Sequence, residues 1–239
     1  MSRKLPRPLT NFMSNMRSFA VAHGRYIKAL KIEAVLCDAL GLTEIFNCSI
    51  LDIGAGSGHI AAHFAPKNNV IAADIENQLC VEGVSLDFVQ LKGASLPFHD
   101  ASFDVVILNH VLPYIPDHLN ALKEVFRILK HTGLCYISLP NRLFPIDPNT
   151  HIPLIHYLPQ ILYSKILTTL TGANENVRMY TLGKMIKLFE SAGFSSQDYT
   201  IDILHEPAKY HSGISYGLPA WNWMSKISPT NIFILRVKT

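Results

Sequence analysis

The chain has 239 residues, of which 49% are hydrophobic and 16% are charged, and its formal net charge at pH 7 is +3. This length fits one α/β domain with extensions, whereas two full domains would be cramped. The charge is too small, and the lysines and arginines are too scattered, to predict a nucleic-acid-binding surface. The sequence has no stretch of about eighteen uninterrupted apolar residues, so we expect no transmembrane helix. Peripheral membrane contact and the oligomeric state stay open.

The N-terminus, the histidines and the cysteines indicate where the protein is located and whether it binds a metal. Pro6 and Pro8 interrupt the region where a secretory signal would carry its apolar core, so we expect a cytoplasmic protein. His59 and His63 share a helix face, but no third ligand stands at metal-binding spacing, so we expect no metal. No cysteine has a paired redox or metal spacing, and we expect buried thiols at Cys37, Cys48, Cys80 and Cys135.

The first half of the chain alternates between strand and helix patterns. Apolar residues at helical spacing predict a helix from about Tyr26 to Leu40 within an N-terminal extension of residues 1–45. The alternation that follows predicts a parallel sheet, whose ligands lie at the carboxyl ends of the strands. Its elements are a strand at Ser49–Ile53, a helix at about Ser57–Ala65 and a strand at Val70–Ala73.

A glycine-rich loop follows the first predicted strand. A dinucleotide-binding loop has the spacing Gly-x-Gly-x-x-Gly, but here His59 stands at the third glycine position. Asp52, two residues before the first glycine, would repel a pyrophosphate and attract an ammonium group. The loop therefore favours a ligand that carries an ammonium group. The candidate cofactor-binding residues here are Asp52, Gly54, Ala55, Gly56 and Gly58.

The second half of the chain repeats the pattern and adds two segments that lie outside it. Asp117 is the predicted N-cap of a helix at Pro116–Lys130. The segments Arg142–Arg178 and His205–Pro229 are too long for ordinary connections, and the first contains an amphipathic stretch at Leu158–Leu170. Gly133 is the predicted end of this Pro116–Lys130 helix, and a second helix is predicted from Thr181 to Gly193. The predicted strands are Phe103–Leu108, Leu134–Leu139, Gln197–Ile203 and Asn231–Val237.

Two motifs resemble a known family. Residues 50–58, Ile-Leu-Asp-Ile-Gly-Ala-Gly-Ser-Gly, closely resemble motif I of the class I S-adenosylmethionine (AdoMet)-dependent methyltransferases. Residues 96–106, Leu-Pro-Phe-His-Asp-Ala-Ser-Phe-Asp-Val-Val, resemble a segment of the group that includes the ubiquinone and sterol methyltransferases. The resemblance implies AdoMet as the cofactor and a Rossmann-like α/β fold. That fold has a seven-stranded, mostly parallel sheet, helices on both faces and a final antiparallel hairpin.

The resemblance also implies cofactor contacts. Asp74 ends the second predicted strand, where the family's acidic residue binds the adenosine ribose. Ahead of Leu-Pro-Phe the family commonly has an aspartate that accepts the adenine amino group, whereas this chain has Lys92 there or beside it. The backbone of Gly93 and Ala94 could pair with adenine instead. The remaining expected cofactor contacts are Ile75 and Asn109.

Methyl transfer is an in-line displacement, in which an alcohol acceptor needs a base to remove its proton. His110 is the first candidate for that base, and the alternative is a histidine that only orients its loop. His151 and His156, inside the segment Arg142–Arg178, are further candidates. The expected acceptor-side residues are Tyr114, Tyr157, Trp221 and Trp223.

The two unmatched segments predict the acceptor class, because aromatic and aliphatic residues outnumber charged ones in them. We expect one methyltransferase domain over residues 1–239, with 142–178 and 205–229 on the substrate side. It would transfer a methyl group to an oxygen, nitrogen or carbon of a small lipophilic or aromatic molecule. Two alternatives remain. A nicotinamide- or flavin-dependent oxidoreductase is disfavoured by His59 and Asp52, and a non-catalytic AdoMet-fold protein is weakly favoured by Lys92.

Overall fold

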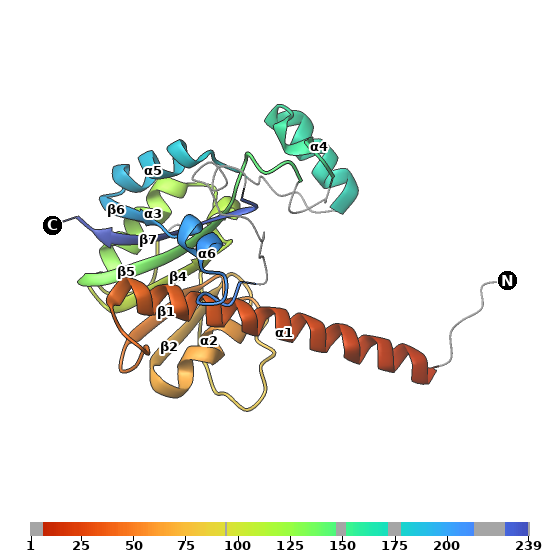
Figure 1. Ribbon diagram of the computed structural model, residues 1–239, viewed down its shortest axis with the longest axis horizontal. Helices are drawn as coiled ribbons and strands as arrows, with labels where there is room; N and C mark the ends of the chain where they lie inside the picture. Colours follow the sequence, from red (N-terminus) through yellow and green to blue (C-terminus); the bar gives the residue numbers. More distant parts are fainter. Residues whose placement is uncertain (1–6, 94, 147–151, 172–177, 213–227, 239) are drawn as a thin grey trace.

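The computed structural model describes residues 7–93, 95–146, 152–171, 178–212 and 228–238. A seven-stranded sheet runs through these residues in the order β3-β2-β1-β4-β5-β7-β6, with helices on both of its faces (Figure 1). This is the Rossmann-like α/β fold that the sequence predicts.

Five neighbouring strands are parallel and form the half of the sheet that bears the glycine loop. The first strand has the predicted bounds. The strand β3 was not predicted, because Phe88 and Val89 are its only apolar residues and neither is fully buried. The five strands are β1 (Ser49–Ile53), β2 (Asn69–Asp74), β3 (Asp87–Gln90), β4 (Phe103–Asn109) and β5 (Leu129–Pro140).

The C-terminal strands complete the sheet in the antiparallel sense. The strand β7 (Thr230–Val237) lies between β5 and β6 (Phe194–Asp198) and is antiparallel to both. Gly193 precedes β6 with a φ of 97°, and a Cβ there would lie 2.9 Å from the ring of Phe126. The predicted antiparallel end of the sheet is confirmed.

The chain turns out of the sheet after β6, so the predicted strand at Gln197–Ile203 is wrong. The Asp198 carboxylate accepts the backbone N–H of Thr200 at 2.8 Å, a local bond that favours a turn over a continued strand. Helix α6 (Thr200–His205) follows and buries Ile203.

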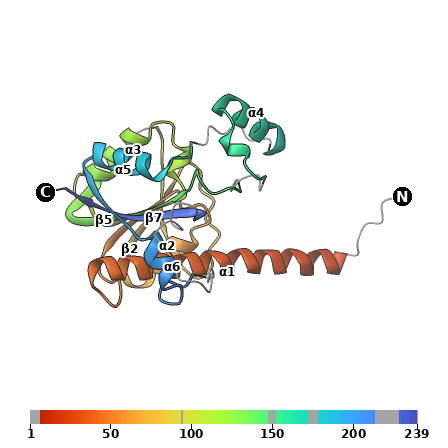
Figure 2. The same cartoon turned by 45° about the horizontal axis from the view of Figure 1, so that its top comes forward.

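One face of the sheet is covered by α1 (Arg7–Leu40), α2 (His59–Phe64) and α6 (Figures 1 and 2). The predicted helix at Tyr26–Leu40 is confirmed, but it begins earlier, and α1 projects well beyond the sheet in both views. The short turn η1 (Ala65–Lys67) continues α2. The core of this face includes Ile32, Leu36, Ile50, Phe64, Val105 and Ile107.

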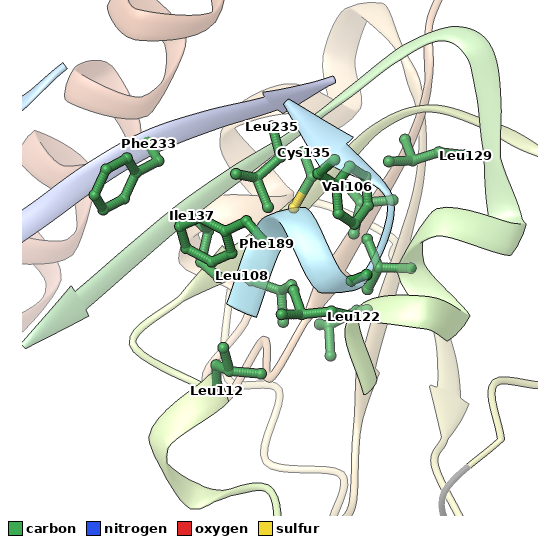
Figure 3. Close-up of a cluster of buried hydrophobic side chains, with 14 of the residues drawn as sticks. Val106, Leu108, Leu112, Leu122, Leu129, Cys135, Ile137, Phe189, Phe233 and Leu235 are labelled. Atoms are coloured by element: carbon green, nitrogen blue, oxygen red, sulfur yellow. The ribbon is translucent and has the colours of Figure 1, made fainter. Parts of the chain in front are cut away.

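The opposite face is covered by α3 (His118–Ile128) and α5 (Leu182–Ser191). The predicted N-cap of α3 is confirmed, because Oδ1 of Asp117 accepts the backbone N–H of Asn120 at 3.0 Å. Figure 3 shows how side chains of both helices meet those of the strands. This core includes Val106, Leu108, Leu122, Cys135, Ile137, Phe189, Phe233 and Leu235.

Gly133 does not end the α3 helix, as the sequence suggested. The helix ends at Ile128, and Gly133 lies inside β5. A Cβ on Gly133 would lie 3.0 Å from the backbone oxygen of Phe103. The glycine is therefore required by the close approach of β5 to β4.

Residues 152–171 form a small unit that stands apart from the sheet in both views (Figures 1 and 2). It contains the turn η3 (Ile155–Tyr157) and α4 (Gln160–Thr171), so the predicted helix is confirmed, but Ile161 and Leu162 of its expected apolar side are exposed and not covered. Tyr163 of α4 is 2% exposed and packs against Ile155, whereas Ile161 is 71% exposed. Within the described ranges, no helix is long and apolar enough to cross a membrane.

The cysteines and the paired histidines have ordinary protein contacts. Cys135 is buried as expected, whereas Cys80 is exposed, so the prediction of a buried thiol there is wrong. His63 pairs with Glu33 of α1 at 2.7 Å, and Nδ1 of His59 lies 2.8 Å from the hydroxyl of Ser57. These contacts join α1, α2 and the glycine loop.

Candidate active site

The glycine loop between β1 and α2 has a backbone that strongly favours glycine. Gly54, Gly56 and Gly58 have φ angles of 72°, 52° and 80°, a region that residues with a Cβ rarely adopt. A Cβ on Gly54 would lie 2.2 Å from Cγ2 of Val111, and one on Gly58 would lie 2.6 Å from Cδ2 of Leu79. A Cβ on Gly56 would instead meet open space. The loop is thus packed tightly at its two ends and leaves room in its middle.

Asp74 ends β2 and is fixed against this loop. One carboxylate oxygen accepts the backbone N–H of Gly56 at 2.8 Å, and the other accepts that of Ile75 at 2.7 Å. A carboxylate offers about four acceptor positions, so these two bonds orient Asp74 and leave it able to accept hydroxyl donors. The arrangement joins the acidic residue and the glycine loop in one unit at the carboxyl edge of the sheet.

A cavity of about 410 Å³ lies beside Asp74, between the strand ends and α3. The structure brings five of the predicted site residues to its wall: Gly54, Asp74, Ile75, Gly93 and Tyr114. Lys92 is exposed and is not part of the wall, and Ala94 lies outside the described residues. The cavity combines a largely apolar lining with a carboxylate, which suits a ligand with a flat apolar part and hydroxyl groups.

Sequence reasoning missed most of the apolar wall. Its members come from the ends of β1 and β4, from the loop that follows β3, from the turn η2 (Leu112–Tyr114) and its neighbours, and from α3. Apolar residues at these positions read as ordinary core, and no motif distinguishes the ones that face a cavity. The missed residues are Ile53, Leu91, Leu96, Leu108, Val111, Ile115, Pro116, Asp117, Asn120, Ala121, Glu124 and Val125.

A bidentate ion pair on α3 fixes one wall of the cavity. The Nε and Nη2 atoms of Arg127 donate to the two carboxylate oxygens of Glu124 at 2.9 and 2.8 Å. Glu124 also accepts the backbone N–H of Leu96 at 2.8 Å, and Arg127 donates to the backbone oxygens of Leu96 and Phe98 at 3.0 and 2.8 Å. These bonds lower the pKa of Glu124 to about 2, with Arg127 as the largest cause. The pair holds the Leu-Pro-Phe segment on α3.

Asp52 is 1% exposed and lies under the start of α2 rather than on the cavity wall. Burial raises the pKa of Asp52 to about 7, against the effect of a hydrogen bond from the Ala61 backbone N–H, and the charge of Asp74 adds to the rise. Its Oδ2 has no hydrogen-bond partner among the described residues. A buried carboxylate oxygen without a partner is costly, which is a feature of sites that a ligand completes. Its predicted ammonium contact stays a prediction.

Asn109 and His110 lie where β4 ends, at the same edge of the sheet. The Ser138 hydroxyl donates to Oδ1 of Asn109 at 2.8 Å. His110 has a φ of 59°, and its backbone N–H donates to the Ser138 oxygen at 3.0 Å. Burial lowers the pKa of His110 to about 4, and the positive charges of Lys28 and Lys31 add to this. His110 is therefore neutral at pH 7, and so low a pKa makes it a weak base.

A family model and curated relatives match this part of the chain. The model, described as a methyltransferase domain, matches residues 51–137. The ubiquinone/menaquinone biosynthesis C-methyltransferase UbiE of Vibrio vulnificus (strain YJ016) is 28% identical over 169 residues, which are 63% of this chain and 65% of the relative. The demethylmenaquinone methyltransferase of Lactococcus lactis is 28% identical over 174 residues, or 65% of this chain and 69% of the relative. Over this part of its length the chain is similar to methyltransferases.

Solved structures share the fold of this chain. A possible histamine N-methyltransferase from Thermotoga maritima matches with a TM-score of 0.56 at 18% identity, over 95% of this chain and 97% of that one. A putative methyltransferase from Bacillus halodurans matches with a TM-score of 0.53 at 14% identity, over 87% and 99%. By contrast, this chain spans only 65% of the length of the first curated relatives that it matches.

The residues predicted for the acceptor side are described only in part. The Tyr157 hydroxyl donates to the Leu143 oxygen at 2.8 Å, within the first long segment and away from the cavity wall. The backbone of His156 lies in η3, and its side chain is outside the described part of the chain. Also outside the described residues are His151, Trp221 and Trp223.

Proposed function

We propose that this chain binds AdoMet and transfers its methyl group to a small-molecule acceptor. The observation that carries the proposal is Asp74, whose carboxylate is fixed by the N–H groups of Gly56 and Ile75 beside the 410 Å³ cavity. Bound AdoMet would supply a methyl group activated by its sulfonium. The family match over residues 51–137 supports the same reading.

The residues of the site fit the parts of AdoMet. Asp74 has acceptor positions left for the ribose hydroxyls, and the apolar wall suits adenine. Gly56 and Gly93 have positive φ angles and space where a Cβ would lie, so backbone there is open to close approach by a ligand. The unpartnered oxygen of Asp52 would complement a cationic group, and Asn109 lies at the neighbouring strand end.

The chain's own residues contribute mainly by orientation. Holding donor and acceptor in line can supply roughly 7–11 kcal/mol of the barrier, and the interlocked loop, Asp74 and α3 provide a rigid frame for this. The apolar wall excludes water from the cavity. His110 stays the candidate base for a hydroxyl acceptor, but its pKa of about 4 makes it a weak one, which suits an acceptor that gives up its proton readily.

The acceptor that we propose is lipophilic or aromatic. Two curated relatives at 28% identity carry quinone names, and the first long segment exposes large apolar side chains. These include Leu154, Tyr157, Leu158, Ile161 and Leu162. We also propose that residues 1–239 form one methyltransferase domain in the cytoplasm, with 142–178 and 205–229 on its acceptor side.

Two measurements test the proposal. Equilibrium binding of labelled AdoMet and of NAD to the full chain should show AdoMet binding alone, and preferential NAD binding would favour the oxidoreductase alternative. Mass spectrometry of a metabolite extract after incubation with methyl-labelled AdoMet should show one labelled acceptor. Tight AdoMet binding without any labelled product would support the non-catalytic alternative and contradict the proposed transfer.

A further inference from the structure

Two lysines of α1 stand on the same side of the helix near the catalytic edge. Lys28 and Lys31 are three residues apart, which makes them neighbours on a helix surface, where like charges destabilise each other. Lys31 is half-buried, and burial lowers its pKa, with the charge of Lys28 as a second cause. Both charges reach His110 at the end of β4. Lys31 also shares a cavity wall with Ile232, which pairs with Ser138 of β5, and the Ser138 backbone oxygen accepts the N–H of His110.

Among the residues that the structure describes, no acidic side chain neutralises this pair. The only acidic residues of α1 are Glu33, which pairs with His63 at 2.7 Å, and Asp38, which pairs with Lys209 at 2.5 Å. Within the described ranges, neither Lys28 nor Lys31 has an ion-pair partner. A half-buried cation without a counter-charge is unfavourable, and a bound anion would remove that cost.

Lys31 also borders a small cavity of about 80 Å³ on this face of the sheet. Hydroxyl groups contribute to the wall, and Thr200 and Ser228 already bond to the backbone of β7. The cavity has the space of a few water molecules, at about 30 Å³ each, which fits the head of a ligand and not its body. The other residues of the wall are Ile203, Leu204, Ser212, Pro229, Thr230 and Ile232.

We propose that Lys31, assisted by Lys28, binds an anionic group of the acceptor, a carboxylate or a phosphate, in the small cavity that Lys31 and Ile232 border. The substrate class is then an amphiphile with an anionic head and an apolar body. This deepens the proposed function and rests on it, because it treats the ligand of this site as the methyl acceptor. Fixed cations here would also stabilise an oxyanion that forms when the acceptor loses its proton.

The test uses three eight-carbon probes that differ only in the head group: octanoate, octyl phosphate and 1-octanol. Calorimetric titration into the full chain should show that at least one anion binds about tenfold tighter than the alcohol, and the better anion identifies the head group. Lys31→Met keeps the length of the side chain and should abolish that preference. Lys187→Met, which removes an exposed lysine of α5 on the opposite face, should leave it unchanged.

Equal binding of all three probes, binding of none, or an anion preference that survives in folded Lys31→Met would overturn the proposal. Thermal unfolding shows whether that variant is folded. If it is not, Lys28→Met carries the test from an exposed position and should reduce the preference about threefold. AdoMet binding is measured separately on the same samples. If the chain prefers the anions but does not bind AdoMet, only the proposed function is contradicted. If the chain binds AdoMet but does not prefer the anions, only the anion site is contradicted.

Discussion

The proposed donor and acceptor sides of the site are held in different ways. On the donor side, Asp74 is fixed by two backbone N–H groups, and Arg127 and Glu124 lock the Leu-Pro-Phe segment to α3. On the acceptor side, α4 buries Tyr163 against η3 and leaves Ile161 71% exposed. Charge-assisted bonds to backbone define one geometry, whereas a small apolar contact permits several. The donor side is thus built for one ligand, and the acceptor side leaves more freedom to vary.

The donor side can be disrupted most strongly at Gly54. In Gly54→Ala the positive φ costs about 1–2 kcal/mol, and the clash with Val111 adds about 1–3 kcal/mol. Gly83→Ala is the matched control, since Gly83 has a φ of 75° and no atom near its added Cβ. Urea unfolding should show a clearly greater loss for Gly54→Ala. Equal losses in the two variants would mean that the loop can move away from Val111.

The carboxylate at the end of β2 should matter for ligand binding more than for folding. Asp74→Asn places an amide donor against one of the N–H groups of Gly56 and Ile75 and removes an acceptor for the ribose. AdoMet affinity, measured by equilibrium dialysis, should fall about tenfold or more. Asp87→Asn, at an exposed site on β3, should bind as the unmodified chain does. Unchanged affinity in Asp74→Asn would contradict the ribose assignment.

Loss of the ion pair on α3 should loosen one wall of the cavity. Arg127→Ala leaves the Glu124 carboxylate and two backbone oxygens without their donor, which should cost about 1–3 kcal/mol of unfolding free energy. The KM for AdoMet should rise several-fold while kcat changes less, and Arg127→Lys should recover only part because lysine lacks the fork of donors. Lys123→Ala, exposed on the same helix, is the control. A kcat effect alone would argue against a role in holding the wall.

The same pair predicts an acid sensitivity. Because the pKa of Glu124 is lowered from 4.5 to about 2 on folding, its contribution is complete above pH 4.5 and is lost as the pH falls toward 2. The difference in unfolding free energy between the unmodified chain and Glu124→Gln should therefore be smaller at pH 3 than at pH 7. A difference that does not change with pH would show that Glu124 is not held as a charged group.

The smallest effect is expected on the acceptor side. Ile161→Ser replaces a side chain that is 71% exposed, so unfolding free energy should change by less than about 0.5 kcal/mol, and AdoMet affinity should not change. Any functional effect should appear in the KM for the acceptor. A large loss of stability would show that α4 is packed more firmly than its contact with η3 indicates.

Local patterns in the sequence predicted the elements whose signals are contained within a few residues. The nearly continuous apolar run of β1 gave its bounds, Asp117 capped α3 as expected, and Asp74 was placed at the ligand edge by its position at the end of a strand. Each of these follows from chain-local chemistry, namely an apolar run, capping and the carboxyl ends of parallel strands.

What local patterns could not predict depends on contacts between distant residues. Arg127 and Leu96 are 31 residues apart, and nothing around either one indicates the bond between them. The cavity wall is apolar in the same way as the core, so its members could not be separated from core residues. The end of β6 was predicted wrongly. The Thr200 N–H donates to the Asp198 carboxylate, and this local bond favours a turn where the sequence pattern predicts that the strand continues.

The place of β7 in the sheet constrains the order in which the domain can form during synthesis. Because β7 lies between β5 and β6, residues 230–237 must be made before β5 gains its second partner and β6 its partner in the sheet. Until then the chain presents the long open edge of β5, with Cys135 and Ile137 uncovered, to any other strand nearby. A nascent domain of this kind is most exposed to aggregation just before its last strand leaves the ribosome.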